Sequence, residues 1–220
     1  KWELNTNCQR ILALEYNYIN TIDQVILFLQ GKLDTIAHLI CSRTFLPEAD
    51  AFDQMDDLDW AFGAMGKQDK AKHIATMYLE DLGNLIKETI DPYFGFSRYA
   101  ESLGRSANSF DALYAALNAP QSYLDNILLD IFEQYIQKVQ PKLVCISVPF
   151  PGNLYTSLRC GQWLKQHHPS IKVAMGGGFA NTELRSLSDP RVFEFYDFIT
   201  LDDGEAPIEI LIDHIDGKKE

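Results

Sequence analysis

The stretch Lys172-Val-Ala-Met-Gly-Gly-Gly-Phe-Ala-Asn-Thr-Glu-Leu-Arg185 decides how the second half of this chain is interpreted. A short apolar run breaks into three consecutive glycines, and polar residues of the kind that begin a helix follow at once. A strand, a bare turn and a helix in this order are typical of a parallel α/β sheet. Glycine can simply turn a chain tightly, but three in succession favour a ligand or a partner surface at the end of the strand.

The same alternation extends to both sides of this stretch, from residue 141 to about residue 217. We predict strands and helices in turn over the ranges 143–148, 152–167, 171–175, 181–187, 198–201 and 207–214. The first strand is apolar on both of its faces, which is typical of a parallel strand that is covered on both sides. The predicted fold class is therefore α/β, a Rossmann-like or flavodoxin-like parallel sheet with right-handed crossovers.

Residues 1–140 follow a helical period instead. Helices are predicted from a cap at Asn5–Asn7 to Gln30 and over the ranges 33–43, 67–90 and 121–140. In the last of these helices the predicted inward-facing residues are Ile127, Leu128, Ile131, Tyr135 and Ile136. We expect residues 1–140 to form a large helical portion that packs on the sheet of residues 141–217.

Composition limits the partners of the chain. The formal net charge is −12, and a surface of this sign repels nucleic acid and anionic membrane, so neither is expected as a partner. The cysteines Cys8, Cys41, Cys145 and Cys160 lie far apart without a C-x-x-C pair, which favours buried reduced thiols in a cytoplasmic protein over a zinc site. No metal site is predicted, and no apolar run is long enough to span a bilayer.

Parallel strands bring the loops that follow them to one edge of the sheet, where ligands bind in open α/β folds. The predicted binding residues on the three loops are Ser147 and Pro149, then Gly176, Gly177, Gly178 and Phe179, then Asp202, Gly204 and Glu205. Asp203 or Glu205 is also placed to cap the helix that begins near Pro207, and capping is the role we expect for them.

The two common nucleotide motifs fit this edge poorly. Gly176 and Gly178 supply a G-x-G pair, but Asn181 stands where the dinucleotide fingerprint has its third glycine. Asp197 precedes its strand, whereas a ribose-binding acid follows one. A nucleotide-binding, flavodoxin-like domain stays an alternative, and it would hold a phosphate at Gly176–Gly178.

The motifs of these loops resemble the cobalamin-binding (B12-binding) domain that precedes the catalytic barrel in many radical SAM iron–sulfur proteins. In that domain an S-x-L signature is followed at a set distance by a G-G pair. Here Ser147-Val-Pro149, with proline in place of leucine, is separated from Gly176-Gly177 by 26 residues. The tail from Gly176 to Ile212 is similar to the end of that domain in a family of uncharacterised radical SAM proteins, and residues 21–31 also resemble that family.

The resemblance implies a corrinoid at the glycine-bearing edge, a small-molecule substrate, and a radical SAM barrel with a 4Fe-4S cluster and SAM in the full protein. The signature D-x-H-x-x-G is absent, and its nearest counterpart, Asp34–His38, has the wrong spacing, so no histidine is expected to bind cobalt. The signature C-x-x-x-C-x-x-C is absent too, so the barrel is expected beyond Glu220 as a partner in the same polypeptide. A strand that family members carry at the N-terminus is expected to be missing.

No catalytic residue is predicted in this chain, because the radical chemistry would belong to the cofactors of the barrel. The rival interpretation is a domain that binds no corrinoid and serves as a scaffold or a substrate-recognition cap.

Overall fold

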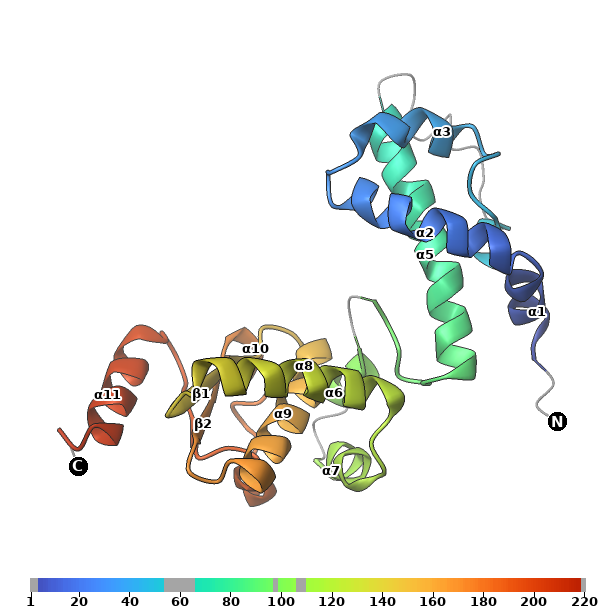
Figure 1. The fold of residues 1–220 in the computed structure, drawn as a ribbon. Helices are drawn as coiled ribbons and strands as arrows, with labels where there is room; N and C mark the ends of the chain where they lie inside the picture. Colours follow the sequence, from blue (N-terminus) through green and yellow to red (C-terminus); the bar gives the residue numbers. More distant parts are fainter. Residues whose placement is uncertain (1–3, 54–65, 97–98, 106–109, 219–220) are drawn as a thin grey trace. The chain divides into compact units, whose positions relative to one another are not determined.

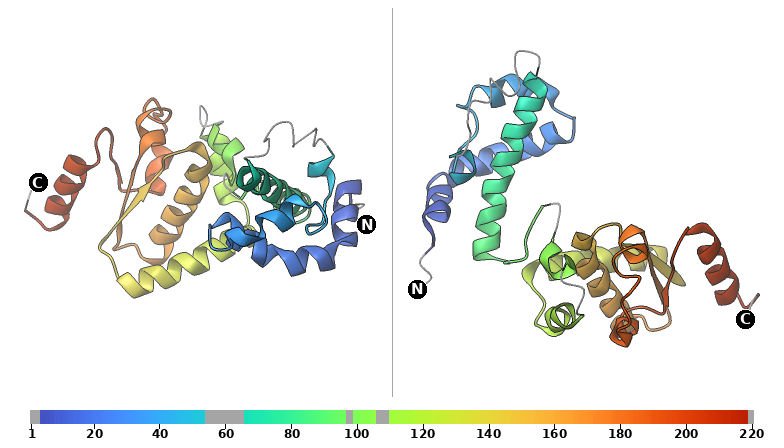
Figure 2. Two further views of the ribbon diagram at one scale, coloured as in Figure 1. Left: turned by 90° about the horizontal axis from the view of Figure 1, so that it is seen from above. Right: turned by 180° about the vertical axis from the view of Figure 1, so that it is seen from behind.

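The computed structural model describes residues 4–53, 66–96, 99–105 and 110–218. The chain divides into two compact units, Lys1–Pro92 and Tyr93–Glu220, and each has its own hydrophobic core. Figures 1 and 2 show the helices and strands of both units. A small acidic cluster of the sequence, Asp53–Asp59, lies outside the described residues from residue 54 onward.

The first unit is helical. Its elements are α1 (Thr6–Ala13), α2 (Glu15–Leu29), the short 3-10 turns η1 (Asp34–Ile36) and η2 (Asp50–Phe52), α3 (Ala37–Cys41) and α5 (Lys67–Thr89). The predicted cap at Asn5 is confirmed, because its side chain accepts a hydrogen bond from Cys8 N at 2.8 Å. The predicted single helix to Gln30 is wrong in one respect, since the chain leaves helical geometry at Leu14, with φ −103° and ψ 12°.

A buried carboxylate organises the core of the first unit. Asp81 of α5 is fully buried and accepts hydrogen bonds from Tyr18 Oη at 3.1 Å and from Ala49 N and Ala51 N, each at 2.9 Å. Desolvation by burial raises the pKa of Asp81, although these donors oppose the shift. The carboxylate therefore fixes the segment around residue 50 against α5 and α2.

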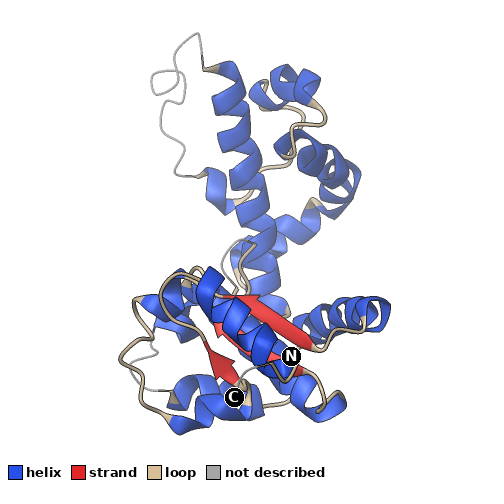
Figure 3. Cartoon of the chain, turned by 90° about the vertical axis from the view of Figure 1, so that its left-hand side faces the viewer, coloured by secondary structure: helices blue, strands red, loops and turns tan. Residues whose placement is uncertain are grey.

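The second unit is a mixed α/β structure around a small parallel sheet. Its helices are α6 (Glu101–Arg105), α7 (Asp111–Asn118), α8 (Tyr123–Val139), η3 (Pro151–Asn153), α9 (Leu154–His167), α10 (Gly178–Asn181), η4 (Pro190–Glu194) and α11 (Glu205–Ile215). The strands β1 (Leu143–Ser147), β2 (Lys172–Gly176) and β3 (Phe198–Ile199) lie in the order β1-β2-β3 and are all parallel. Figure 3 draws the strands in red among the helices. The predicted α/β class with a parallel sheet is confirmed.

The helices α6, α7 and α8 belong to the same unit as the sheet, so the division at Pro92 and Tyr93 differs from the boundary expected near residue 141. The reason is a shared core, in which α8 packs with α9 and the sheet. A buried ion pair reinforces this core. Arg159 of α9 lies 3.1 Å from Asp125 of α8, and its guanidinium also donates to Leu117 O at the end of α7.

Three predictions about the α/β elements are wrong. The strand β1 is not covered on both sides, because Cys145 and Ser147 are exposed, and Cys145 is accordingly not a buried thiol. The helix expected over 181–187 is instead a short helix at Gly178–Asn181, which the positive φ of Gly177 (+106°) leads into directly, and residues 182–186 form turns. Of the stripe expected to face inward on α8, Ile136 is buried as predicted, but Ile127, Ile131 and Tyr135 are exposed, because the buried face continues through Asp125 and Leu129.

Candidate functional site

The parallel order of the strands brings three loops to the carboxyl edge of the sheet. These loops follow β1, β2 and β3, and all nine predicted binding residues lie in them or at the adjoining end of a strand or helix. The first two loops are hydrogen-bonded to each other beyond the ends of their strands. Val148 N donates to Gly176 O at 2.7 Å, and Phe179 N donates to Val148 O at 3.0 Å.

This contact accounts for the bare backbone at Gly177. A Cβ atom there would lie 2.7 Å from Val148 N and 2.9 Å from Ser147 Oγ, closer than a side chain can approach. The positive φ of Gly177 adds a second reason, since only glycine adopts this conformation without strain. The chain itself therefore requires the glycine, whether or not a ligand binds.

The other two glycines differ from each other. A Cβ atom at Gly176 would lie 2.5 Å from Thr200 Oγ1, so this position is also closely packed by the chain. At Gly178 the nearest atom would be Pro149 O at 3.6 Å, an ordinary contact. Gly178 is thus the one glycine of the three that local packing does not require.

The third loop is fixed by polar contacts. Asp202 has a left-handed backbone, with φ +65°, and its carboxylate pairs with Arg185 at 2.6 Å. Hydrogen bonding and charge attraction from Arg185 lower the pKa of the Asp202 carboxyl. The expectation that Asp203 or Glu205 caps the following helix is wrong, because Gly204 is the N-cap of α11 and no side chain bonds there.

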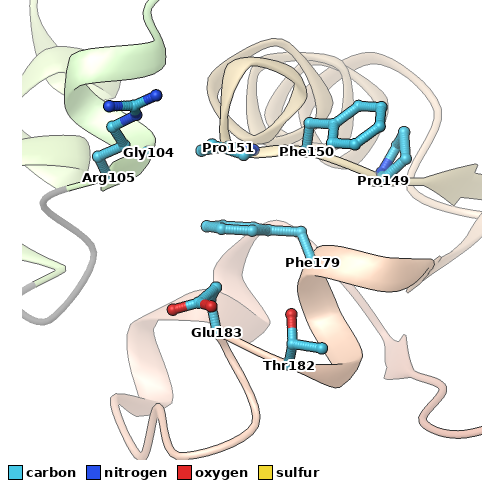
Figure 4. Close-up of a pocket in the computed structure, with 8 residues that line it drawn as sticks. All are labelled: Gly104, Arg105, Pro149, Phe150, Pro151, Phe179, Thr182 and Glu183. Carbon is cyan, nitrogen blue, oxygen red and sulfur yellow. The ribbon is translucent and has the colours of Figure 1, made fainter.

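A cleft of about 360 Å³ lies at this edge, beside the loops that follow β1 and β2 (Figure 4). Its lining residues are Gly104, Arg105, Pro149, Phe150, Pro151, Phe179, Thr182 and Glu183. Helix α6 forms one wall, and it approaches so closely that a Cβ atom at Gly104 would lie 2.2 Å from Pro151 O. Of the predicted residues, only Pro149 and Phe179 line the cleft.

The remaining predicted residues are near this edge without lining the cleft. Ser147, Gly176 and Gly177 lie in the backbone contact between the first two loops. Gly178 precedes Phe179, while the third loop contributes nothing to the lining. Sequence reasoning missed the wall supplied by α6. A glycine inside a helical pattern, such as Gly104, was the available signal, because glycine weakens a helix unless close packing needs it.

The chemistry of the cleft suits binding. Phe179 is buried, and Figure 4 shows its ring between Pro151 and Glu183, whereas Phe150 is 68% exposed. The charged groups are Glu183 and Arg105, and Arg105 is held by Glu101 of the same helix at 2.9 Å. Two aromatic rings and prolines offer apolar surface to a flat ligand, and the charged groups can orient it. The one hydroxyl of the lining, Thr182 Oγ1, donates to Gly178 O at 3.0 Å.

The described residues contain no group of three or more His, Cys, Asp or Glu side chains that could hold a metal ion. The three loops at the carboxyl edge contain no histidine. His167 stacks on Trp163 with ring centroids 4.8 Å apart, and His214 packs against Phe198. In the described part of the chain, no helix is both long and apolar enough to cross a membrane.

Comparison of the chain with protein-family models, with curated proteins and with solved structures finds no match. The resemblance to a cobalamin-binding domain therefore depends on the motifs in the sequence, and the function is a proposal that starts from the cleft.

Proposed function

We propose that the second unit is the accessory, Rossmann-like domain of a radical SAM iron–sulfur protein, and that it binds a small molecule in the cleft at its carboxyl edge. The observation that carries the proposal is the cleft itself, walled by Phe150 and Phe179 where β1 and β2 end. Open parallel sheets bind ligands at this edge, beyond the carboxyl ends of their strands. In this role the domain recognises a substrate or caps a catalytic barrel, and its own residues bind and orient without reacting.

Cobalamin is the second candidate ligand. The contact between Ser147 and Gly177 favours it, because these residues adjoin as the paired S-x-L and G-G signatures require. The residues present nevertheless do not fit a tightly held corrinoid. No imidazole is available at the edge to bind cobalt, and the two hydrogen bonds of Val148 close the space between the first two loops. Chemistry at cobalt is therefore not part of the proposed role.

The nucleotide alternative has less support. A phosphate at Gly176–Gly178 would need free backbone N–H groups from the turn that follows β2. Phe179 N donates to Val148 O, and Asn181 N donates to Gly177 O at 3.1 Å. Both donors are already used within the chain.

Calorimetric titration tests the cleft directly. The first probe is 2-naphthoate, which has a flat apolar ring and one carboxylate, matching the aromatic walls and Arg105. Hydroxocobalamin, followed also by visible absorbance, is the second probe. The site variant is Phe150→Ala. Its matched control is Phe193→Ala, which removes another exposed phenylalanine, 55% exposed, that lies outside the cleft.

We expect saturable binding of the naphthoate to the natural chain, at least tenfold weaker in Phe150→Ala and unchanged in Phe193→Ala. Binding of hydroxocobalamin with the same dependence on Phe150 would make the corrinoid the ligand. An absence of binding by either probe, or an equal loss in both variants, would overturn the assignment of the cleft.

A further inference from the structure

The strand β1 leaves one edge of the sheet unpaired within the described chain, since its only neighbour is β2. Its even-numbered residues face β2, as shown by the bonds from Lys172 N to Lys142 O at 2.9 Å and from Val148 N to Gly176 O at 2.7 Å. Residues alternate in a parallel ladder, so the backbone groups of Leu143, Cys145 and Ser147 point to the free edge.

Over residues 143–147 this edge has none of the features that usually prevent strand pairing, and Pro141 and Pro149 limit any pairing to this stretch. Exposed edges in natural proteins carry charges, prolines or bulges that block another strand. The strand Leu143-Val-Cys-Ile-Ser147 has no charge and no proline, and its register with β2 is regular over all five residues. Its composition is that of a strand with neighbours on both sides.

Helix α8, which leads into β1, has an apolar face that the described residues of its own unit leave uncovered. The exposed residues recur every fourth position and are 41% to 67% exposed: Tyr123, Ile127, Ile131, Tyr135 and Val139. The opposite face of the helix is packed against α9 through Phe132 and Trp163, whose rings are 5.8 Å apart. A helix that is apolar on both faces is typically buried on both.

We propose that a second copy of this chain covers both surfaces, in a two-fold dimer formed by β1 against β1 and α8 against α8. Each surface is self-complementary about its own centre. Antiparallel pairing of β1 about Cys145 places Leu143 opposite Ser147 of the other copy. Antiparallel pairing of α8 about Ile131 places Tyr135 opposite Ile127 and Tyr123 opposite Val139, so each ring meets an aliphatic side chain.

Charge favours this occupant over a partner recognised electrostatically. The chain has a net charge of −12, yet neither β1 nor the exposed stripe of α8 contains a charged residue. Two acidic copies can approach through these surfaces without placing like charges in contact.

The faces of the sheet on which α8 and Cys145 lie also fit such a dimer. Val144 and Ile146 pack on the core that includes Leu129 and Ile136 of α8, so α8 lies on the face of the sheet opposite Cys145. A two-fold axis perpendicular to the sheet keeps the two α8 helices together on one face. The same axis brings the two Cys145 side chains together on the other face of the sheet.

The pairing has a measurable consequence at Cys145. Directly opposed residues of an antiparallel hydrogen-bonded pair have Cα atoms about 5.5 Å apart. A short bis-maleimide therefore reaches both exposed Cys145 thiols of the dimer. We expect it to link two chains of the natural protein. The link should disappear in Cys145→Ser and persist in Cys41→Ser, the matched control at the other cysteine that is not buried.

Analytical ultracentrifugation tests the helix surface. The natural chain should sediment with twice the chain mass of 25.0 kDa. Ile131→Glu, or Tyr135→Glu as a second variant, should shift the dimer dissociation constant upward by at least tenfold while circular dichroism stays unchanged. Tyr16→Glu adds the same charge at an apolar residue of α2 that is 80% exposed, and it should leave the dimer intact.

A natural chain that stays monomeric at all concentrations tested would overturn the proposal. So would a dimer that Ile131→Glu and Tyr135→Glu leave unchanged, or a cross-link that depends on Cys41. The inference does not depend on the cleft, because none of the residues that carry it lines that cleft.

Discussion

Asn181 and Asp202 bind each other through two hydrogen bonds that join the second and third loops of the carboxyl edge. Asp202 N donates to Asn181 Oδ1 at 2.6 Å, and Asn181 Nδ2 donates to Asp202 O at 3.1 Å. An amide side chain can make both bonds at once, because its oxygen accepts and its NH2 group donates. The pair holds Asp202 in its left-handed conformation and sets the path of the chain from β3 into α11.

Asn181→Ala removes both hydrogen bonds, so we expect it to lower the free energy of unfolding by about 1 kcal/mol. Urea denaturation measures this change, and hydrogen exchange should show faster exchange at residues 200–206. Arg185→Ala is the control, because it removes only the exposed ion pair to Asp202 and should change stability less. Equal effects of the two variants would show that the amide pair does not hold the loop.

Gly177→Ala should lower the free energy of unfolding by roughly 1–3 kcal/mol, because the new Cβ atom meets Val148 N and the residue keeps a positive φ. Gly178→Ala should change it by less than about 0.5 kcal/mol, since its Cβ atom has only an ordinary contact. Thermal and urea unfolding of both variants measure the difference.

The comparison also tests why these glycines are present. If Gly178→Ala destabilises the chain as much as Gly177→Ala, local packing does not distinguish the two positions and our explanation is wrong. If Gly178→Ala leaves stability unchanged but weakens ligand binding, the bare backbone of Gly178 serves the cleft.

The strands and helices of the second unit were largely predictable, because alternation of short apolar runs and helical periods follows from local physics. The face on which a helix packs was not predictable from the sequence. On α8 the sequence offers two apolar faces, and only the neighbouring α9 determines that Leu129 and Ile136 are buried and Ile131 is exposed.

The candidate site was predictable in part for a similar reason. A parallel sheet fixes the edge at which loops meet, so Pro149 and Phe179 were found from the order of elements alone. The wall formed by Gly104 and Arg105 comes from a helix about 45 residues earlier in the chain, and such a contact leaves no periodic signal. The glycine run predicted close approach correctly at Gly177, but the group that approaches is the backbone of Val148.

Asp81→Ala should lower the free energy of unfolding by about 2–4 kcal/mol, because it leaves Ala49 N, Ala51 N and Tyr18 Oη without their acceptor in a buried site. Hydrogen exchange of α5 amides should locate the loss in the first unit. Asp23→Ala, at an exposed position of α2, is the control and should change stability by less than about 0.5 kcal/mol. A small effect of Asp81→Ala would mean that other groups or water replace the carboxylate.

The contacts of Asp197 predict that the stability of the second unit depends on pH. Burial alone would raise the pKa of its carboxyl, but Lys165 at 2.6 Å, Val173 N at 2.9 Å and Lys172 at 3.3 Å together lower it. A carboxylate whose pKa is lower in the folded chain than in the unfolded chain stabilises the fold at any pH above its unfolded pKa, which is about 4. This stabilisation is lost as the pH falls through the folded pKa.

Asp197→Asn should therefore lower the free energy of unfolding by roughly 1 kcal/mol at pH 7 and by progressively less below about pH 4. Urea unfolding of the natural chain and of Asp197→Asn at pH 7, 5 and 3 measures this difference, and the subtraction removes the other carboxylates that titrate in the same range. A difference that stays constant down to pH 3 would show that the ion pairs with Lys165 and Lys172 do not stabilise the start of β3.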